Sequence, residues 1–109
     1  DEFPLRHRFL IADPTRTEPW RSIIARNTPG GAPAGAAVFI AQGTADNEVL
    51  PAVTERYTQR LCRRGTPVRY VKLPGITHNA AARASAQEAV AWLEQRFAGA
   101  RPPSDCAKR

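Results

Sequence analysis

The sequence has no long hydrophobic run. None of its apolar stretches reaches the roughly 18 or more residues that a membrane-spanning helix needs. A secretory leader pattern is not visible either, and the first residue is Asp1 rather than methionine. We therefore expect no transmembrane segment, and we expect the chain to be processed or to be part of something longer.

Motifs for metals and cofactors are also missing. The two cysteines, Cys62 and Cys106, lie 44 positions apart and have neither Cys-x-x-Cys nor Cys/His spacing. We expect no metal and no cofactor. The cysteines are either two unrelated thiols or one disulfide that ties the C-terminal tail to a helix. A disulfide would indicate an oxidising compartment.

Aromatic residues are scarce, at 7% of the chain, although the formal net charge is +6. A positive charge favours anionic partners in general. However, 14 of the 16 basic residues are arginines spread along the whole chain, and only Arg60, Arg63 and Arg64 form a modest cluster. Surfaces that bind nucleic acids gather basic residues and interleave them with exposed aromatics. We expect no nucleic-acid partner.

The remaining composition is that of an ordinary globular chain, with 42% hydrophobic and 24% charged residues in a length of 109. Its first part, residues 1–35, begins irregularly and contains one helical pattern after Thr17, which is a candidate N-cap. The segment "NTPGGAPAG", 27–35, is too rich in glycine and proline for regular structure and reads as a linker or a binding loop.

Residues 36–99 alternate between strand and helix patterns. The apolar run "AAVFIAQG", 36–43, is typical of a parallel strand covered on both faces, and "PVRYVKLPG", 67–75, predicts a strand nearer a sheet edge. Helical patterns occupy 50–65 and 80–97. One stripe of the first helical pattern contains Leu50, Val53, Tyr57 and Leu61, and one face of the second contains Ala86, Ala89, Val90, Leu93 and Phe97.

One titratable residue follows each predicted strand. Asp46 stands three residues past Gly43, and His78 stands three residues past Gly75. The loops after neighbouring parallel strands lie side by side at the carboxyl edge of the sheet. A carboxylate there can fix the tautomer of a histidine and stabilise its protonated form. Taken singly, Asp46 is a turn former or helix cap, and His78 is a helix-cap neighbour or a satisfied imidazole. Their matched positions favour a functional pair.

The order strand, "QGTAD", helix, strand, "PGITH", helix resembles the C-terminal end of an α/β-hydrolase. The likeness is closer to the secreted lipases and esterases of fungi and actinomycetes. It rests on "PW" at 19–20, "NTPG" at 27–30, "LCRRGTPVRYVKLPGITH" at 61–78, and "WLEQRFAG" at 92–99 followed by a tail cysteine. It covers roughly residues 18–106.

The resemblance implies a fold class and a set of roles. The fold would be α/β, a βαβα C-terminal segment of an α/β-hydrolase with two parallel strands and flanking helices. Residues 1–35 would be the end of a lid or cap insertion and a linker, 36–99 the hydrolase segment, and 100–109 a tail. Asp46 would be the triad acid and His78 the general base, and Cys62 would pair with Cys106. An ester or lipid would be the substrate, and the protein would be secreted or in the cell envelope.

The sequence departs from that family in one large respect. The nucleophile of these enzymes lies on a G-x-S-x-G elbow upstream of the acid and the histidine. No such motif is present, because Ser22, Ser85 and Ser104 have no glycine frame. We therefore expect the C-terminal fragment of a serine carboxylic-ester hydrolase, inactive alone. Its partner would be the missing N-terminal half, or another copy joined through an exposed sheet edge. The alternative is a non-catalytic binding module derived from a hydrolase scaffold.

Overall fold

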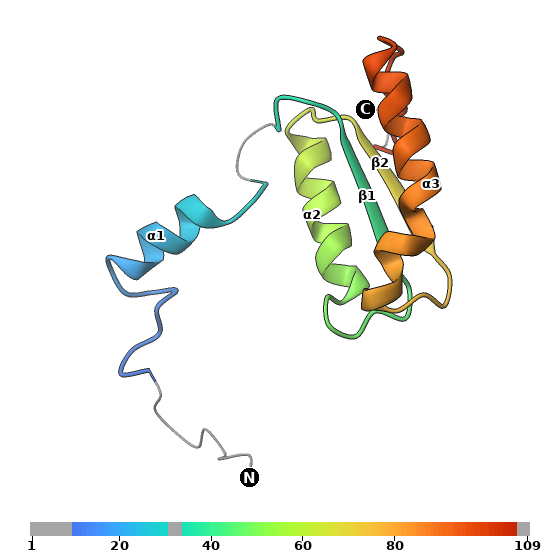
Figure 1. Cartoon of the computed structure of the whole chain (residues 1–109). Helices are drawn as coiled ribbons and strands as arrows, with labels where there is room; N and C mark the ends of the chain where they lie inside the picture. Colours follow the sequence, from blue (N-terminus) through green and yellow to red (C-terminus); the bar gives the residue numbers. More distant parts are fainter. Residues whose placement is uncertain (1–9, 31–33, 107–109) are drawn as a thin grey trace. The chain divides into compact units, whose positions relative to one another are not determined.

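The computed structural model of the chain describes residues 10–30 and 34–106. The chain divides into two compact units, with the boundary between Gly31 and Ala32. Figure 1 draws both, and each unit is described by itself. Within the described ranges, no helix combines the length and the apolar character needed to cross a membrane.

The first unit contains one short helix, α1 (Trp20–Asn27). Pro19 occupies the N-cap position, so the prediction that Thr17 caps the helix was wrong. The hydroxyl of Thr17 instead donates to the carbonyl oxygen of Asp13 at 2.8 Å, which ties the preceding turn together. Of the predicted linker, residues 31–33 lie outside the described residues, and the remainder after α1 has neither helix nor strand.

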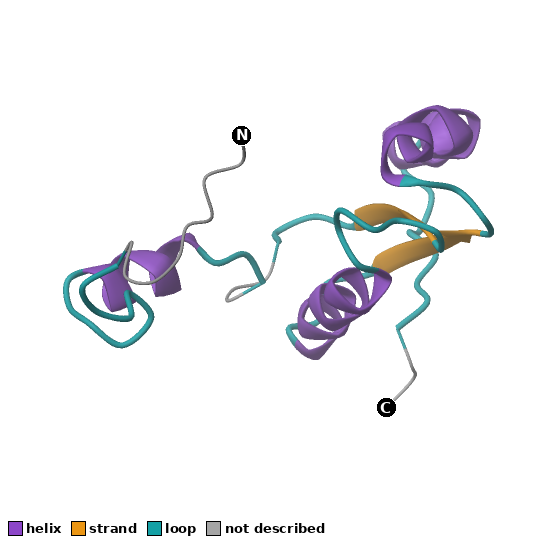
Figure 2. Ribbon diagram, turned by 90° about the horizontal axis from the view of Figure 1, so that it is seen from below, coloured by secondary structure: helices purple, strands orange, loops and turns teal. Residues whose placement is uncertain are grey.

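The second unit is a two-stranded parallel sheet with two helices. Its elements are β1 (Val38–Gly43), α2 (Pro51–Arg63), β2 (Val68–Leu73) and α3 (His78–Phe97). Val38 pairs with Val68 at the start of the strands, and Gly43 pairs with Leu73 at their end. Viewed along the sheet in Figure 2, α2 and α3 cover opposite faces. The prediction of an α/β unit with two parallel strands and flanking helices is confirmed.

Local sequence explains where α2 begins and ends. Pro51 stands in its first turn, where the missing backbone N–H is not needed and the fixed φ suits a helix. At the other end, Gly65 has a φ of 79°, and its amide donates to the carbonyl oxygen of Cys62 at 3.0 Å. A left-handed residue at this position favours glycine and turns the chain back toward β2.

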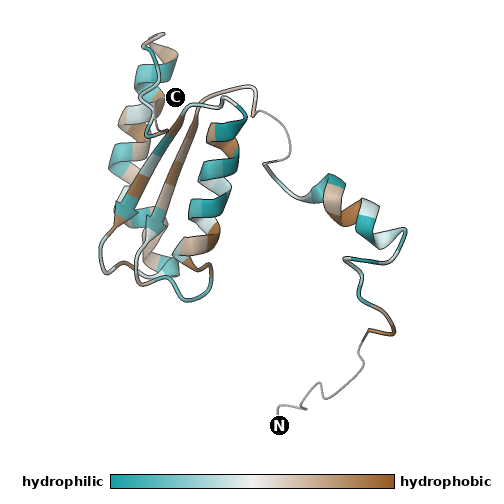
Figure 3. Ribbon diagram, turned by 180° about the vertical axis from the view of Figure 1, so that it is seen from behind, coloured by the Kyte–Doolittle hydropathy of each residue, from teal (hydrophilic) through white to brown (hydrophobic). Residues whose placement is uncertain are grey.

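The core of the second unit is small. Leu61, Val68 and Trp92 are its buried apolar residues, with exposed fractions of 2%, 0% and 9%. The ring of Phe39 on β1 lies 5.8 Å from that of Trp92 on α3, centroid to centroid. Figure 3 shows the apolar colour along the strands between the two helices. Burial on this scale is modest for a free-standing domain.

The face of α3 that the apolar pattern marks in the sequence is not the face that the helix buries. Ser85 and Trp92 are the buried residues of this helix, whereas Val90, Leu93 and Phe97 are 54%, 47% and 89% exposed. Trp92 is the largest side chain of the helix. Because its ring packs against Phe39 on β1, the face of α3 that carries Trp92 is the one that lies on the sheet. An apolar stripe of α3 is consequently left on the surface. Leu50 and Val53, from the predicted stripe of α2, are also exposed, at 56% and 44%.

The C-terminal tail closes the outer edge of β2. Cys62 and Cys106 form a disulfide with an S–S distance of 1.98 Å, in agreement with the pairing that the resemblance implied. Beside it, the amide of Asp105 donates to the carbonyl oxygen of Val68 at 2.8 Å, and its Oδ2 accepts the amide of Tyr70 at 2.7 Å. By the chain-entropy estimate, such a crosslink stabilises the fold by about 4 kcal/mol.

Candidate active site

Asp46 and His78 meet at the carboxyl end of the sheet. Asp46 lies in the loop after β1, and His78 is the first residue of α3, directly after the loop that follows β2. The Nδ1 atom of His78 is 3.0 Å from the Oδ2 atom of Asp46. The structure therefore brings together the two residues that the sequence singled out.

Gly43 allows the two loops to approach so closely. A Cβ atom at this position would lie 2.1 Å from the carbonyl oxygen of Ile76, far inside contact distance. That carbonyl accepts the amide of Ala45 at 3.1 Å, and the hydroxyl of Thr44 accepts the amide of Gly75 at 2.8 Å. A side chain at position 43 would force the loops apart, and with them the acid and the histidine.

Both carboxylate oxygens of Asp46 are fully engaged. Oδ1 accepts the backbone amides of Glu48 and Val49 at 3.0 and 2.9 Å. Oδ2 accepts the side-chain amide of Gln42 at 3.1 Å in addition to its contact with His78. Asp46 thus forms the turn before α2 and also holds the histidine. Its exposed fraction is only 6%, so these donors replace the water it has lost.

The pKa values of the Asp46–His78 pair move in opposite directions. Burial is the largest single effect on Asp46 and would raise its pKa, but hydrogen bonds from His78, two backbone amides and Gln42 together lower it from 3.8 to about 2. The hydrogen bond with Asp46, followed by the charge of that carboxylate, raises the pKa of His78 above its ordinary 6.5, against burial. Glu48 adds a smaller upward effect. An ionised acid and a strengthened base result.

This arrangement determines which ring nitrogen of His78 can act as a base. An ionised carboxylate only accepts hydrogen bonds, so Nδ1 of a neutral His78 carries the proton and Nε2 has the lone pair. Nε2 makes no hydrogen bond to the described residues, and the side chain is 42% exposed. A reacting group can therefore reach Nε2 from solvent, and the pair can take up and return a proton there.

Gln42 is a site residue that the sequence did not single out. It is 5% exposed and lies next to the end of β1, with its amide nitrogen on Asp46. The available signal was its place as the one polar side chain in the apolar run "AAVFIAQG", since a buried amide requires partners.

The two serines of the second unit, Ser85 and Ser104, form hydrogen bonds with backbone groups and none with His78. Ser85 donates its hydroxyl back to the carbonyl oxygen of Ala81 at 2.9 Å, as expected for a helical serine. Ser104 accepts the amide of Cys106 at 3.3 Å. Across the described ranges, no group of three or more His, Cys, Asp or Glu residues could hold a metal ion.

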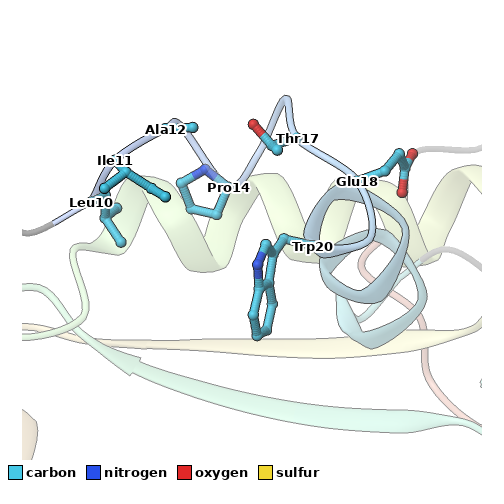
Figure 4. Close-up of a pocket in the computed structure, with 7 residues that line it drawn as sticks. All are labelled: Leu10, Ile11, Ala12, Pro14, Thr17, Glu18 and Trp20. Atoms are coloured by element: carbon cyan, nitrogen blue, oxygen red, sulfur yellow. The ribbon is translucent and has the colours of Figure 1, made fainter.

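The first unit contains an apolar hollow of about 420 Å³, shown in Figure 4. Its lining residues are Leu10, Ile11, Ala12, Pro14, Thr17, Glu18 and Trp20. The one carboxylate among them, Glu18, forms an ion pair with Arg21 at 2.7 Å. No pair of titratable groups comparable to Asp46 and His78 lines this hollow.

Comparison with known protein families identifies a family for this chain. Neither the curated proteins nor the solved structures contain a significant match to this sequence. The family model for secretory lipases matches residues 16–105, which is most of the chain. Membership in that family and the disulfide both indicate an extracellular protein. On this evidence the chain belongs to the secretory lipase family.

Proposed function

We propose that this chain supplies the acid and the general base of a serine carboxylic-ester hydrolase, a lipase or esterase, on the C-terminal segment of an α/β-hydrolase fold. The observation that carries the proposal is the 3.0 Å contact between His78 Nδ1 and Asp46 Oδ2. It lies beyond the carboxyl ends of two parallel strands, where α/β proteins place their functional groups. Membership in the secretory lipase family supports the substrate class, an ester or a lipid.

In the proposed mechanism, Nε2 of His78 takes the proton of a serine hydroxyl as the oxygen attacks the ester carbonyl. The imidazolium then returns that proton to the leaving alcohol, and water repeats the cycle on the acyl-enzyme. Asp46 stays ionised throughout, as its low pKa requires, and stabilises the imidazolium while it exists. The raised pKa of His78 makes Nε2 a better proton acceptor than a free imidazole.

The nucleophile in this proposal belongs to a part of the enzyme upstream of these residues. No G-x-S-x-G elbow occurs in the sequence, and the residue after the nucleophile normally supplies part of the oxyanion hole. We therefore propose that this chain is a C-terminal fragment that has no ester hydrolysis of its own. The complete enzyme would act outside the cell, either secreted or in the cell envelope.

The open edge of β1 is where we place the missing part. The tail closes the outer edge of β2 through Asp105, whereas β1 pairs only with β2 among the described residues. Exposed apolar side chains flank the sheet on both helices, which favours burial by further protein. A strand from the N-terminal half, or from another copy, would continue the sheet at β1.

We further assign residues 1–35 to the end of a lid or cap and a linker, 36–99 to the hydrolase segment and 100–109 to the tail. A compact unit that ends at Gly31 is consistent with a separate insertion. The apolar hollow beside Trp20 is suited to contact with hydrocarbon chains. The lid of a lipid-hydrolysing enzyme makes such contacts with its substrate.

Mutagenesis of the complete enzyme tests the proposal. With a soluble ester of a chromogenic alcohol, His78→Ala should lower kcat/KM by several orders of magnitude. Asp46→Asn should lower it by about 10⁴-fold, because the neutral amide no longer selects the required tautomer. KM should change little in both variants.

Ser22→Ala and Ser85→Ala are the matched controls and should retain the activity of the unmodified enzyme. Full activity of the His78→Ala enzyme would disprove the proposal. Ester hydrolysis by the 109-residue chain alone, with an organophosphate attached to Ser22 or Ser85, would disprove the upstream location of the nucleophile.

A further inference from the structure

Hydrogen-bond partners around the side-chain amide of Gln42 hold it in one orientation. Its amide nitrogen lies 3.1 Å from Oδ2 of Asp46, 2.9 Å from the carbonyl oxygen of Gly43 and 3.2 Å from that of Val49. Its amide oxygen accepts the hydroxyl of Thr54 on α2. The nitrogen is surrounded by three acceptors and the oxygen faces a donor. A flipped amide would place its oxygen against those three acceptors, so the flipped orientation is excluded.

The amide of Gln42 and the ring of His78 contact the same oxygen atom of Asp46. Oδ2 of Asp46 receives both the Gln42 amide and the His78 ring, while Oδ1 receives two backbone amides. A carboxylate is a rigid planar group, so the two bonds on Oδ1 already hold its plane. The Gln42 amide is a second donor to Oδ2, and it takes up part of the negative charge that His78 would otherwise meet.

We propose that Gln42 is a positioning residue that acts through Asp46: by donating to Oδ2 it competes with His78 and limits the base strength of that histidine. This inference rests on the proposed function, since base strength matters there for ester hydrolysis. Glutamine suits the role because it is neutral. It can withdraw charge from the carboxylate at any pH between the titrations of Asp46 and His78 without adding a charge of its own.

Few other charges face His78. From the loop after β1 come Asp46 and Glu48, both of which raise the pKa of the histidine. The loop after β2, residues 74–77, has no titratable side chain, and the next charged residue of α3 itself is the exposed Arg83. Besides burial and the two backbone amides on Oδ1, the hydrogen bond from Gln42 to Asp46 opposes the effect of the carboxylate on His78, and it is the one of these hydrogen bonds that falls on Oδ2.

The test is a titration of His78 by NMR in the 109-residue chain, comparing the unmodified chain with Gln42→Met. A His7→Gln background leaves one histidine, so the signal is assigned without ambiguity. Methionine keeps the length of the side chain but cannot donate. The midpoint for His78 should move to higher pH, because Oδ2 loses its second donor. An unchanged or lowered midpoint would overturn the inference.

Thr54→Val is the matched control. It removes a hydrogen bond from the same buried amide but leaves the bond between Gln42 and Asp46 in place. This variant should melt at a lower temperature, as Gln42→Met should, while the His78 midpoint stays that of the unmodified chain. An equal upward shift in Thr54→Val would show that loosening of the cluster is responsible, and the inference would fail.

Two further measurements keep the test decisive. If Gln42→Met does not fold, Gln42→Asn draws the amide back by one methylene and should shift the midpoint in the same direction. In the complete enzyme, the acid limb of the pH profile of kcat/KM should move upward with the midpoint; a limb that stays in place would overturn the inference. Because the titration needs no turnover, full activity of His78→Ala would reject the proposed function without altering the NMR result.

Discussion

At the scale of single residues, the Asp46–His78 pair stabilises the fold and serves the proposed reaction in different pH ranges. Asp46 has a lowered pKa, so its contribution to stability is present above its ordinary 3.8 and is lost as the pH falls toward 2. His78 has a raised pKa, so its contribution is present below 6.5 and is lost as the pH rises through its folded pKa. The proposed reaction needs neutral His78, which prevails only above that range.

We predict that the pair stabilises the fold most between about pH 4 and about pH 6.5. The free energy of unfolding of the unmodified chain and of Asp46→Asn should be measured by urea denaturation across this range and beyond both ends. The difference between the two should be largest inside the window and should shrink on either side. His7→Gln serves as the control and should show no such window. A difference independent of pH would contradict the assignment of the ion pair.

The sequence predicted this pair but missed its supporting amide, for a physical reason. Asp46 and His78 follow two strands at matched positions, and topology alone brings such positions together. Gln42 is recognised only from the direction of its side chain toward α2 and from the distance to Oδ2. Neither is contained in a local pattern of apolar and polar residues.

At the scale of elements, the contact between the two loops depends on the missing side chain of Gly43. We predict that Gly43→Ala lowers the free energy of unfolding by about 3 kcal/mol, because the added methyl meets the backbone of Ile76 rather than a movable side chain. The pKa of His78 should fall toward its ordinary value as Asp46 moves away. Urea denaturation and the NMR titration measure both effects.

Gly75→Ala is the appropriate comparison for that variant. Its φ of 69° makes alanine strained by about 1 kcal/mol, but a Cβ there would meet nothing within 4 Å. It should therefore cost less stability and should leave the His78 titration in place. If Gly43→Ala were as mild as Gly75→Ala, the close approach of the loops would not be what positions the pair.

Helix orientation was the part of the fold that the sequence predicted least well. The residues of α3 that form its strongest apolar stripe are exposed, and the helix buries Ser85 and Trp92 instead. The periodicity of apolar residues identifies an apolar face of a helix. It does not tell whether that face packs against the sheet of the same chain or against further protein. The exposed stripe with Val90, Leu93 and Phe97 is what we expect of a helix that packs against protein on two sides. In this chain the sheet covers one of these sides.

At the scale of the whole molecule, the tail closes the outer edge of β2, whereas β1 pairs with β2 alone among the residues that the structure describes. We predict that the oxidised chain associates through β1 alone, into a dimer or a one-to-one complex with the upstream half. Sedimentation velocity at several concentrations measures this. Opening the other edge with Asp105→Ala and Cys106→Ser should add larger species, because the amide of Tyr70 and the carbonyl of Val68 then lack partners.

Glu88→Gln is the control for the sedimentation experiment. It weakens the ion pair of Arg69 with Glu88 at 2.9 Å but leaves the tail in place, so the chain should sediment as the unmodified protein does. A strictly monomeric, cooperatively folded chain at all concentrations would count against the fragment proposal. Larger species in the oxidised, unmodified chain would show that the tail does not protect its edge.

The covered edge of β2 also bears on the order of events during biosynthesis. Before Cys62 and Cys106 are joined, the tail is held near the strand only by hydrogen bonds and by the ion pair of Asp105 with Arg69. A newly made chain in a reducing compartment therefore has two strand edges at which it can misassemble. Oxidation after export secures one of them covalently. A chain that folds before the disulfide forms therefore has the tail that covers β2 attached by non-covalent contacts alone.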